Sequence, residues 1–374
     1  MGTPDRKMVS DVQSSTYGAR LESKFAFGKN TFYTGLDYKH EGAENIRMIM
    51  PAMMPMRDGT SWQDSSIDQI GWFNEYQMNF KNSKLVASLR LDYNKGDAKA
   101  LSNLFKTLYG DGKAENFNHS LSLGYNKNLC NHNQLGIWLG RAQRSGSLTE
   151  RYINRFAVGI DAYELVGNPD LKPETNNQID LIFTHKKDNI FFQADVFYSY
   201  LENYISGVIV PIKPYSMTAP GTRQIQNIEK AFKTGVETRF NWQFLPKFRT
   251  ELAAAYTYAE DIKTNNPLPE IAPLDFRWNV LADFSPVSLG LHYRYSAKQS
   301  RINPTFGEFT TPEFSVFDFT SKYNVFKNAT LSFDVLNIFD RAYAEHLNRT
   351  LSTNKKQRIL AVGRSFNIGF SYNF

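Results

Sequence analysis

The stretch R-S-F-N-I-G-F-S-Y-N-F at Arg364–Phe374 alternates strictly between two kinds of side chain. The apolar or aromatic members are Phe366, Ile368, Phe370, Tyr372 and Phe374, and the residues between them are small or polar. Because successive side chains of a β-strand point to opposite faces, this period of two predicts a strand with one apolar face. A soluble sandwich contains strands of the same kind, so the rest of the chain has to decide between the two settings.

The composition favours a membrane-spanning sheet. Aromatic residues make up 14% of the 374 residues, yet the mean hydropathy is −0.45. No run of about 18 apolar residues occurs, which excludes a transmembrane helix. A transmembrane β-barrel passes this test, because its lipid-facing side chains alternate with polar ones that face the lumen. The single cysteine, Cys130, excludes an internal disulfide and a cysteine-based zinc site.

The sequence predicts about fifteen strand-like segments separated by turns. They lie near residues 17–27, 30–46, 70–80, 83–98, 116–129, 133–146, 176–188, 189–205, 223–244, 247–262, 274–285, 287–299, 314–326, 329–340 and 363–374. Tight turns alternate with long connectors along the whole chain, as the short periplasmic turns and longer extracellular loops of outer-membrane barrels do. The sequence therefore predicts an all-β fold, an antiparallel transmembrane β-barrel. A two-domain soluble β-protein is the alternative.

The direction of the strands predicts that the barrel is incomplete. The first and last segments both run from a long-loop side toward a short-turn side, so the number of strands is odd. An all-antiparallel barrel closes only with an even number of strands. The polar start of the chain, M-G-T-P-D-R-K, does not resemble an export signal. Together these features predict that the chain is the back part of a larger barrel.

Seven stretches, in order, resemble the carboxyl-terminal barrel of TonB-dependent outer-membrane receptors. They are Arg141–Tyr152, Gly167–Leu181, Asp195–Ile205, Asn227–Glu237, Leu268–Arg277, Leu336–Asn348 and the closing Gly363–Phe374. The resemblance implies a barrel of about 22 strands around an amino-terminal plug, preceded by a TonB-contacting box. On this basis, we expect residues 1–374 to be a partial receptor barrel that lacks the plug, the TonB box and the first strands.

The resemblance also implies a location and partners. The chain is expected in the bacterial outer membrane, crossing it many times in contact with outer-membrane lipid. The terminal alternation from Phe366 to Phe374 is expected to be the assembly signal that the barrel-assembly machinery reads. TonB is expected to act through the missing plug segment, and in a split receptor the missing amino-terminal half would be a separate chain. The net charge of +6 is modest and no nucleic-acid motif occurs, so no nucleic-acid partner is expected.

The sharpest local feature is M-I-M-P-A-M-M-P-M-R at residues 48–57, in an expected extracellular loop. Its methionines are Met48, Met50, Met53, Met54 and Met56. Soft thioether sulfur selects Cu(I), so a copper import receptor is the leading hypothesis, with copper as cargo and no tightly bound cofactor. His346, in a stretch that resembles the copper-receptor branch of the family, is a candidate nitrogen ligand. The alternative for the methionines is apolar packing between loop and plug.

Other functions remain open at this stage. A ferric siderophore or other metal chelate would instead be bound by arginines, for which Arg47, Arg57, Arg223 and Arg301 are available. A passive porin would share the loop alternation and the terminal phenylalanine. The chain has no G-x-S-x-G, no H-E-x-x-H and no phosphate-binding glycine loop, so no enzymatic activity is expected.

Overall fold

The computed structural model describes residues 7–50, 60–156, 163–214, 219–304, 306–348 and 358–373. The helices are α1 (Asn103–Tyr109) and α2 (Leu148–Tyr152), and the strands are β1 (Lys7–Phe27), β2 (Asn30–Met50), β3 (Ser65–Asn79), β4 (Ser83–Ala98), β5 (Ala114–Asn128), β6 (Asn133–Arg144), β7 (Asn154–Phe156), β8 (Glu164–Val166), β9 (Glu174–Lys187), β10 (Ile190–Val210), β11 (Thr222–Leu245), β12 (Phe248–Asp261), β13 (Asp275–Phe284), β14 (Val287–Ser296), β15 (Phe314–Phe326), β16 (Ala329–Leu336) and β17 (Ser365–Tyr372). Neither helix of the described chain has the length and apolarity needed to cross a membrane.

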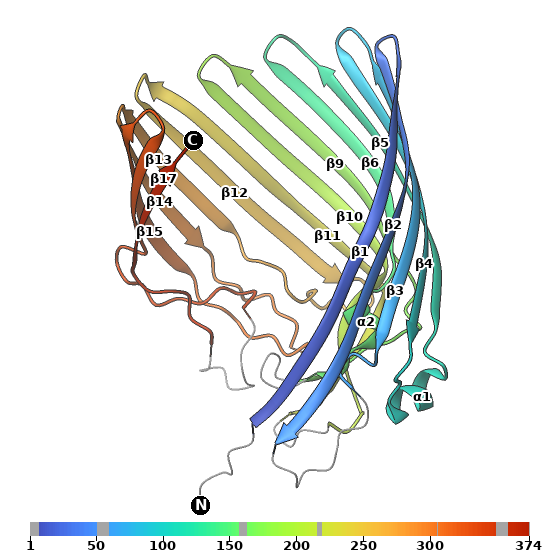
Figure 1. The fold of residues 1–374 in the computed structure, drawn as a ribbon. Helices are drawn as coiled ribbons and strands as arrows, with labels where there is room; N and C mark the ends of the chain where they lie inside the picture. The colour runs from blue at the N-terminus through green and yellow to red at the C-terminus, as the bar shows by residue number, and fades with distance from the viewer. Residues whose placement is uncertain are drawn as a thin grey trace, which may run out of the picture.

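Fifteen strands form one continuous wall. From β1 to β6 and from β9 to β17 each strand pairs antiparallel with the next, and β6 pairs directly with β9. The wall curves into the large part of a barrel, with short turns at the top of the view and long loops at the bottom (Figure 1). The predicted antiparallel barrel of about fifteen strands is confirmed.

The loop end departs from the prediction. The sequence predicts connectors there, whereas the structure has α1, α2 and two strands of three residues each. The strand β8 pairs antiparallel with β7 and parallel with β11. Three residues are too few to produce a visible alternation, so these strands leave no signal in the sequence.

The two faces of the wall differ as the alternation predicts. On β5, Leu121 is 52% exposed, whereas Asn118 on the other face is 4% exposed. Aromatic rings pack against one another along the outer face at two levels. Phe248 and Phe284 lie near the short turns, and Phe232 packs against Tyr258 nearer the long loops. Two aromatic girdles around an apolar band are typical of membrane barrels.

The inner face carries polar and charged side chains bonded across strands. Arg90 of β4 reaches over β3 to Asp37 of β2, with Nη1 2.8 Å from Oδ2, and its Nε lies 2.9 Å from Asp92 Oδ2. Gly71 of β3 makes this crossing possible, because a Cβ there would collide with all three side chains. Ion pairs between β4 and β2 therefore hold the lumen-facing side chains in place here.

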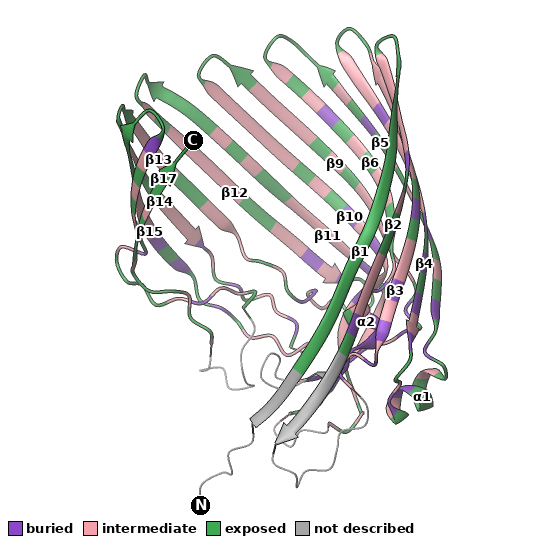
Figure 2. Cartoon of the chain, viewed as in Figure 1, coloured by how far each residue is buried: buried purple, intermediate pink, exposed green. Residues whose placement is uncertain are grey.

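The wall has two edges, β1 and β17. Among the described residues, β1 forms a ladder with β2 and β17 forms one with β16. Both edge strands are largely exposed over their described lengths (Figure 2). The outward residues of β17 run from Phe366, 63% exposed, to Tyr372, while Phe374 lies outside the described residues.

Candidate functional site

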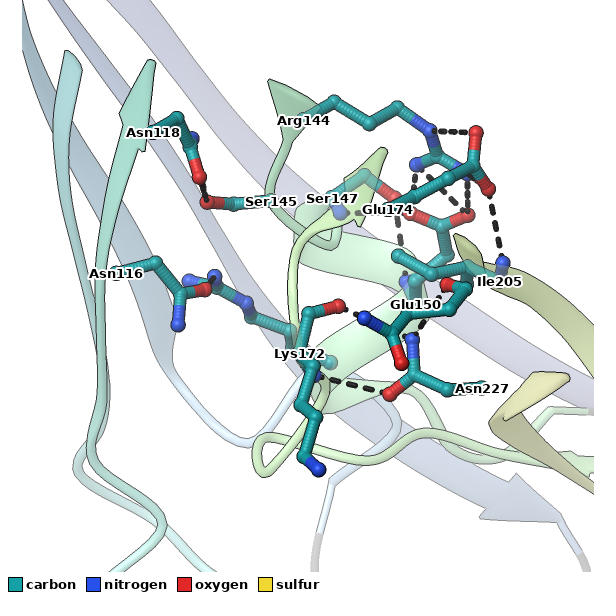
Figure 3. Close-up of polar contacts among 12 residues, drawn as sticks. Asn116, Asn118, Arg144, Ser145, Ser147, Glu150, Lys172, Glu174, Ile205 and Asn227 are labelled. Atoms are coloured by element: carbon teal, nitrogen blue, oxygen red, sulfur yellow. Dashed lines mark hydrogen bonds and ion pairs between the residues drawn. The ribbon is translucent and has the colours of Figure 1, made fainter. Parts of the chain in front are cut away.

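The loop between β6 and β9 folds into a compact unit at the long-loop end of the wall. This unit, the loop module, comprises residues 145–156 and 163–173. It begins with α2, which has a capping box: Glu150 N donates to Ser147 Oγ over 3.3 Å, and Ser147 N donates to Glu150 Oε2 over 2.7 Å (Figure 3). Both amide donors at the start of the helix are thereby satisfied, which stabilises a helix of only one turn.

Arg144, the last residue of β6, ties this helix to the wall. Its Nη1 lies 2.9 Å from Glu150 Oε2 and its Nη2 lies 3.1 Å from Glu174 Oε2 (Figure 3). The same Glu174 oxygen accepts the amide of Ile205 from β10 over 2.8 Å. Burial alone would raise the pKa of Glu150, but Arg144 and the Ser147 amide outweigh it and hold that pKa below its usual range.

Arg151 of α2 is fully buried against the lumen wall. Its Nη1 donates to Asn94 Oδ1 over 2.7 Å and its Nη2 donates to Asn116 Oδ1 over 2.6 Å. The neighbouring Tyr152 packs over Gly96, where a Cβ would lie 2.5 Å from the tyrosine hydroxyl. Burial lowers the pKa of Arg151, so the two amide oxygens are its main compensation for lost hydration.

A buried glutamine connects the module to two more loops. Gln63 Nε2 donates to the carbonyl of Tyr152 over 2.7 Å, and Gln63 Oε1 accepts the amide of Ser102 over 3.0 Å. Ser102 in turn caps α1 through the amide of Phe105. Three loops that are far apart in sequence are thus joined through one side chain.

A second polar group, the histidine cluster, comprises Glu308, Thr311, His346 and Arg358. Thr311 Oγ1 lies 2.9 Å from His346 Nδ1 and accepts a hydrogen bond from Arg358 Nη1 over 2.9 Å. The threonine hydroxyl can donate to Nδ1 or accept from it, so the tautomer of neutral His346 decides which ring nitrogen carries the proton. The Nε2 atom of His346 is buried, has no hydrogen-bond partner among the described residues and lies 3.8 Å from Glu308 Oε1.

The charge states of this cluster follow from its burial. The His346 side chain is 3% exposed, and burial together with Arg358 lowers its pKa. Burial raises the pKa of Glu308, although its oxygens accept the amides of Asn303 and Glu270. His346 is therefore neutral near pH 7, which is the form that can donate a nitrogen lone pair to a metal.

The predicted arginine candidates have different surroundings. Arg223 is buried, with its guanidinium 5.0 Å from the ring of Tyr163 and 4.0 Å from that of Phe306. Arg301 lies 3.5 Å above the ring of Tyr258 and also donates to Glu260. Both guanidinium groups are therefore engaged with protein partners.

The methionine stretch lies only partly within the described residues. Met48 and Met50 are the last members of β2, opposite Val9 and Lys7 of β1. Met53, Met54 and Met56 lie outside the described residues, as does Arg57. Of the predicted metal ligands, His346 is thus the one whose side-chain surroundings the structure describes. Within the described ranges, no three His, Cys, Asp or Glu side chains gather in a way that could hold a metal ion.

Sequence reasoning missed Gln63, Glu308 and the role of Arg151. Each makes its contacts with residues distant in the chain, such as the 89 positions between Gln63 and Tyr152. A pattern read along the sequence carries no signal for such pairs. The capping box S-L-T-E at Ser147–Glu150 is a signal for α2 that could have been found in the sequence, because its spacing is local.

Comparisons with known proteins agree with this architecture. Residues 2–338 match the family model described as TonB dependent receptor-like, beta-barrel. The structure of the copper transporter OprC superposes with a TM-score of 0.82 at 22% identity, covering 98% of this chain and 57% of that one. The FrpB iron transporter from Neisseria meningitidis (F3-3 variant) gives a TM-score of 0.71 at 13% identity, covering 97% and 55%.

A curated relative, heme/hemopexin utilization protein C of Haemophilus influenzae (strain 86-028NP), is 27% identical over 245 residues. That match covers 59% of this chain and 34% of the relative, so the chain spans well under two thirds of the relatives it matches. The names of these proteins describe transport and uptake rather than enzymatic activity. Barrels of the matched family are outer-membrane proteins. On the family match over residues 2–338, this chain belongs to the TonB-dependent receptor β-barrel family.

Proposed function

We propose that this chain is part of an outer-membrane receptor that imports a metal through TonB, with copper as the cargo. The observation that carries the proposal is the methionine cluster at the long-loop end of β2. Met48 and Met50 close that strand, and Met53, Met54 and Met56 follow within six residues of it. Thioether sulfur is a soft ligand that suits Cu(I), and the prolines at positions 51 and 55 restrict the backbone between the sulfurs.

The histidine cluster supports the same proposal. The Nε2 atom of His346 lies in a buried position with a carboxylate oxygen 3.8 Å away. Imidazole nitrogen binds copper in either oxidation state, so His346 would serve as a borderline ligand beside softer sulfurs. During import, the metal would first contact residues at the long-loop end and would then pass through the lumen.

The test is a Cu(I) competition titration on the receptor that contains this chain, with three variants. One replaces all five methionines, from Met48 to Met56, by leucine; one is His346→Ala; and Met78→Leu is the matched control. We expect the fivefold variant to lose at least about 100-fold in affinity, roughly 2.7 kcal/mol, His346→Ala to lose less, and the control to be unchanged. Equal affinity in the fivefold variant and the parent would exclude the methionines as the outer site.

A metal chelate is the second candidate cargo. FrpB is named an iron transporter and the curated relative carries heme in its name. The buried position of Arg223 and the stacking of Arg301 on Tyr258 leave these two guanidinium groups committed to the protein. That commitment favours the bare metal over an anionic chelate. A passive porin is the third candidate, and the family match favours a receptor over it.

We also propose that further strands close the barrel around a plug through which TonB acts. The edge strands β1 and β17 both run from the long-loop end to the short-turn end (Figure 1). They would therefore meet in parallel, and an odd number of additional strands is needed to restore antiparallel closure. Seven strands would bring the wall to the about 22 of plugged outer-membrane transporters. These strands would lie elsewhere in the receptor or in a separate chain. The barrel-assembly machinery would read β17, including the alternation that ends at Phe374.

A further inference from the structure

The outward face of the wall has a hollow of about 740 Å³ across β2–β6, β9 and β10. Its floor follows one row of cross-strand partners, each opposite the next on the neighbouring strand. The row consists of Phe32, Tyr76, Ala87, Leu123, Leu139, Ile179 and Tyr198. Ala87 is the smallest of these residues and lies between larger ones, which accounts for the depth of the hollow.

The hollow runs obliquely across the wall. Phe32 is the third residue of β2 from the short turn, whereas Tyr198 is the ninth residue of β10 from its short turn. Because a strand rises about 3.3 Å per residue, the row climbs toward the long-loop end as it crosses the strands. Aromatic rings close both ends, and the side chains between them are aliphatic. The shape and lining therefore suit a single flexible hydrocarbon chain.

The end of the hollow toward the long loops carries an arginine. Arg141 of β6 points outward, is 38% exposed, and donates from Nη1 to Asn177 Oδ1 over 2.9 Å. Nη1 also forms an ion pair with Glu202 Oε2 across 3.7 Å, without a hydrogen bond. Nε and Nη2 of Arg141 donate no hydrogen bond to the part of the chain that the structure describes. Asn74 also lines the hollow, and its Nδ2 has no acceptor within the described ranges.

An outward arginine is costly in a membrane wall. A lipid-facing arginine is destabilising at the bilayer midplane, and less so where polar groups reach it. A lipid phosphate would accept charge-assisted hydrogen bonds from the free edge of the guanidinium. The hydrocarbon hollow and the arginine at its long-loop end thus fit the two parts of one amphipathic molecule.

We propose that this hollow, the lipid slot, binds a phosphate-bearing anionic membrane lipid. One acyl chain lies along the row from Tyr198 toward Phe32, and the phosphate lies against Arg141. The site is separate from any cargo site, because it is on the outer face of the wall. The proposal requires only that the wall lies in a membrane, so its test does not depend on what the receptor imports.

The test uses the receptor that contains this chain, purified in mild detergent, and measures bound lipid by native mass spectrometry. Phosphatidylglycerol and phosphatidylcholine are titrated separately. We expect the parent to retain one phosphatidylglycerol with about tenfold preference over phosphatidylcholine, the effect of one charge-assisted contact. Arg141→Gln should lose that preference while keeping weak binding of both lipids. Ala87→Phe should lose retention of both, because the ring fills the floor of the slot.

The control is Ala254→Phe, which adds the same ring on the outer face of β12, away from the slot. It should bind lipid as the parent does. Inorganic phosphate at millimolar concentration should leave retention unchanged, since the acyl chain holds the lipid; displacement by phosphate would contradict the proposal. Equal retention in the parent, Ala87→Phe and Arg141→Gln would overturn it. If Ala87→Phe fails to fold, Arg141→Gln alone decides through the loss or survival of the lipid preference.

Discussion

The wall and the loop module are built by opposite means. In the wall, identity at any one position matters little, because alternation between apolar and polar residues places each side chain outward or inward. In the loop module, single side chains such as Arg151 and Gln63 hold together segments that are far apart in sequence. The wall is therefore specified by a pattern, and the module by individual pairs.

This difference has an energetic consequence. The outer face of the wall gains its stability from lipid contact, which tolerates many apolar residues. Every polar atom buried in the module needs its own partner, and loss of one partner leaves the other desolvated. Loss of a fully buried polar side chain in the module should therefore cost most, a charge on the outer face of the wall less, and a charge in the lumen little.

The largest effect is expected for Arg151→Leu. The substitution removes two hydrogen bonds and leaves the buried oxygen of Asn94 and the partly buried oxygen of Asn116 without their donor. We expect the opening free energy of the module to fall by about 4 kcal/mol, because each unsatisfied buried acceptor costs about 1–3 kcal/mol. Hydrogen exchange at the amides of Ile153 and Asn154, which bond to Thr149 and Ser61, measures this opening.

Arg151→Lys is the matched variant for that experiment. An ammonium group retains the charge but reaches one of the two asparagines at a time, so protection should recover by about half. Unchanged exchange in Arg151→Leu would show that the module does not depend on this arginine and would remove the contrast with the wall.

The next effect concerns two adjacent positions of β9 that face opposite ways. Leu181 points outward and is 45% exposed, whereas Ile182 points inward, opposite Asp195 on β10. We expect Leu181→Arg to destabilise the barrel by about 3 kcal/mol and Ile182→Arg by about 0–1 kcal/mol, since only the first places a charge in hydrocarbon. Urea unfolding of the receptor in lipid vesicles measures both. Equal costs would contradict the assignment of the two faces.

The same contrast explains what could be predicted from the sequence. All fifteen wall strands were predicted, because each is long enough for its alternation to be counted. The segments Arg141–Tyr152 and Gly167–Leu181 were identified by resemblance, and the structure shows that they contain the arginines, the capping box and the start of β9. Their contacts were not predictable, since Arg151 and Asn94 are 57 positions apart and belong to no common period.

The candidate metal ligands stay predictions. The structure describes the surroundings of His346 and adds Glu308 as a neighbour 38 positions away in sequence, which no local pattern indicated. The methionine cluster was visible because composition alone reveals it. Its role as a copper site remains a prediction, as does the role of β17 as an assembly signal.

The smallest effect that we expect is a pH dependence of amide protection in the loop module. The pKa of folded Glu150 is held below its usual value of 4.5, chiefly because Arg144 and the Ser147 amide outweigh its burial. A carboxyl group with a depressed folded pKa stabilises the fold above its unfolded pKa, and that contribution is lost as pH falls through the folded pKa. We expect protection of the Ser147 and Arg151 amides to decline below about pH 4.5. The contribution is about 1 kcal/mol, the usual worth of a helix cap.

Glu150→Gln separates this contribution from general acid unfolding. Glutamine accepts the Ser147 amide but forms no ion pair with Arg144, so the variant should start about 1 kcal/mol less protected at pH 7 and change little on acidification. Parent and variant should then converge below the folded pKa of Glu150, where the carboxyl is neutral. Parallel pH profiles would instead show that the acid sensitivity does not arise from Glu150. In that case the contact of Arg144 with Glu150 would add no pH-dependent stability to α2.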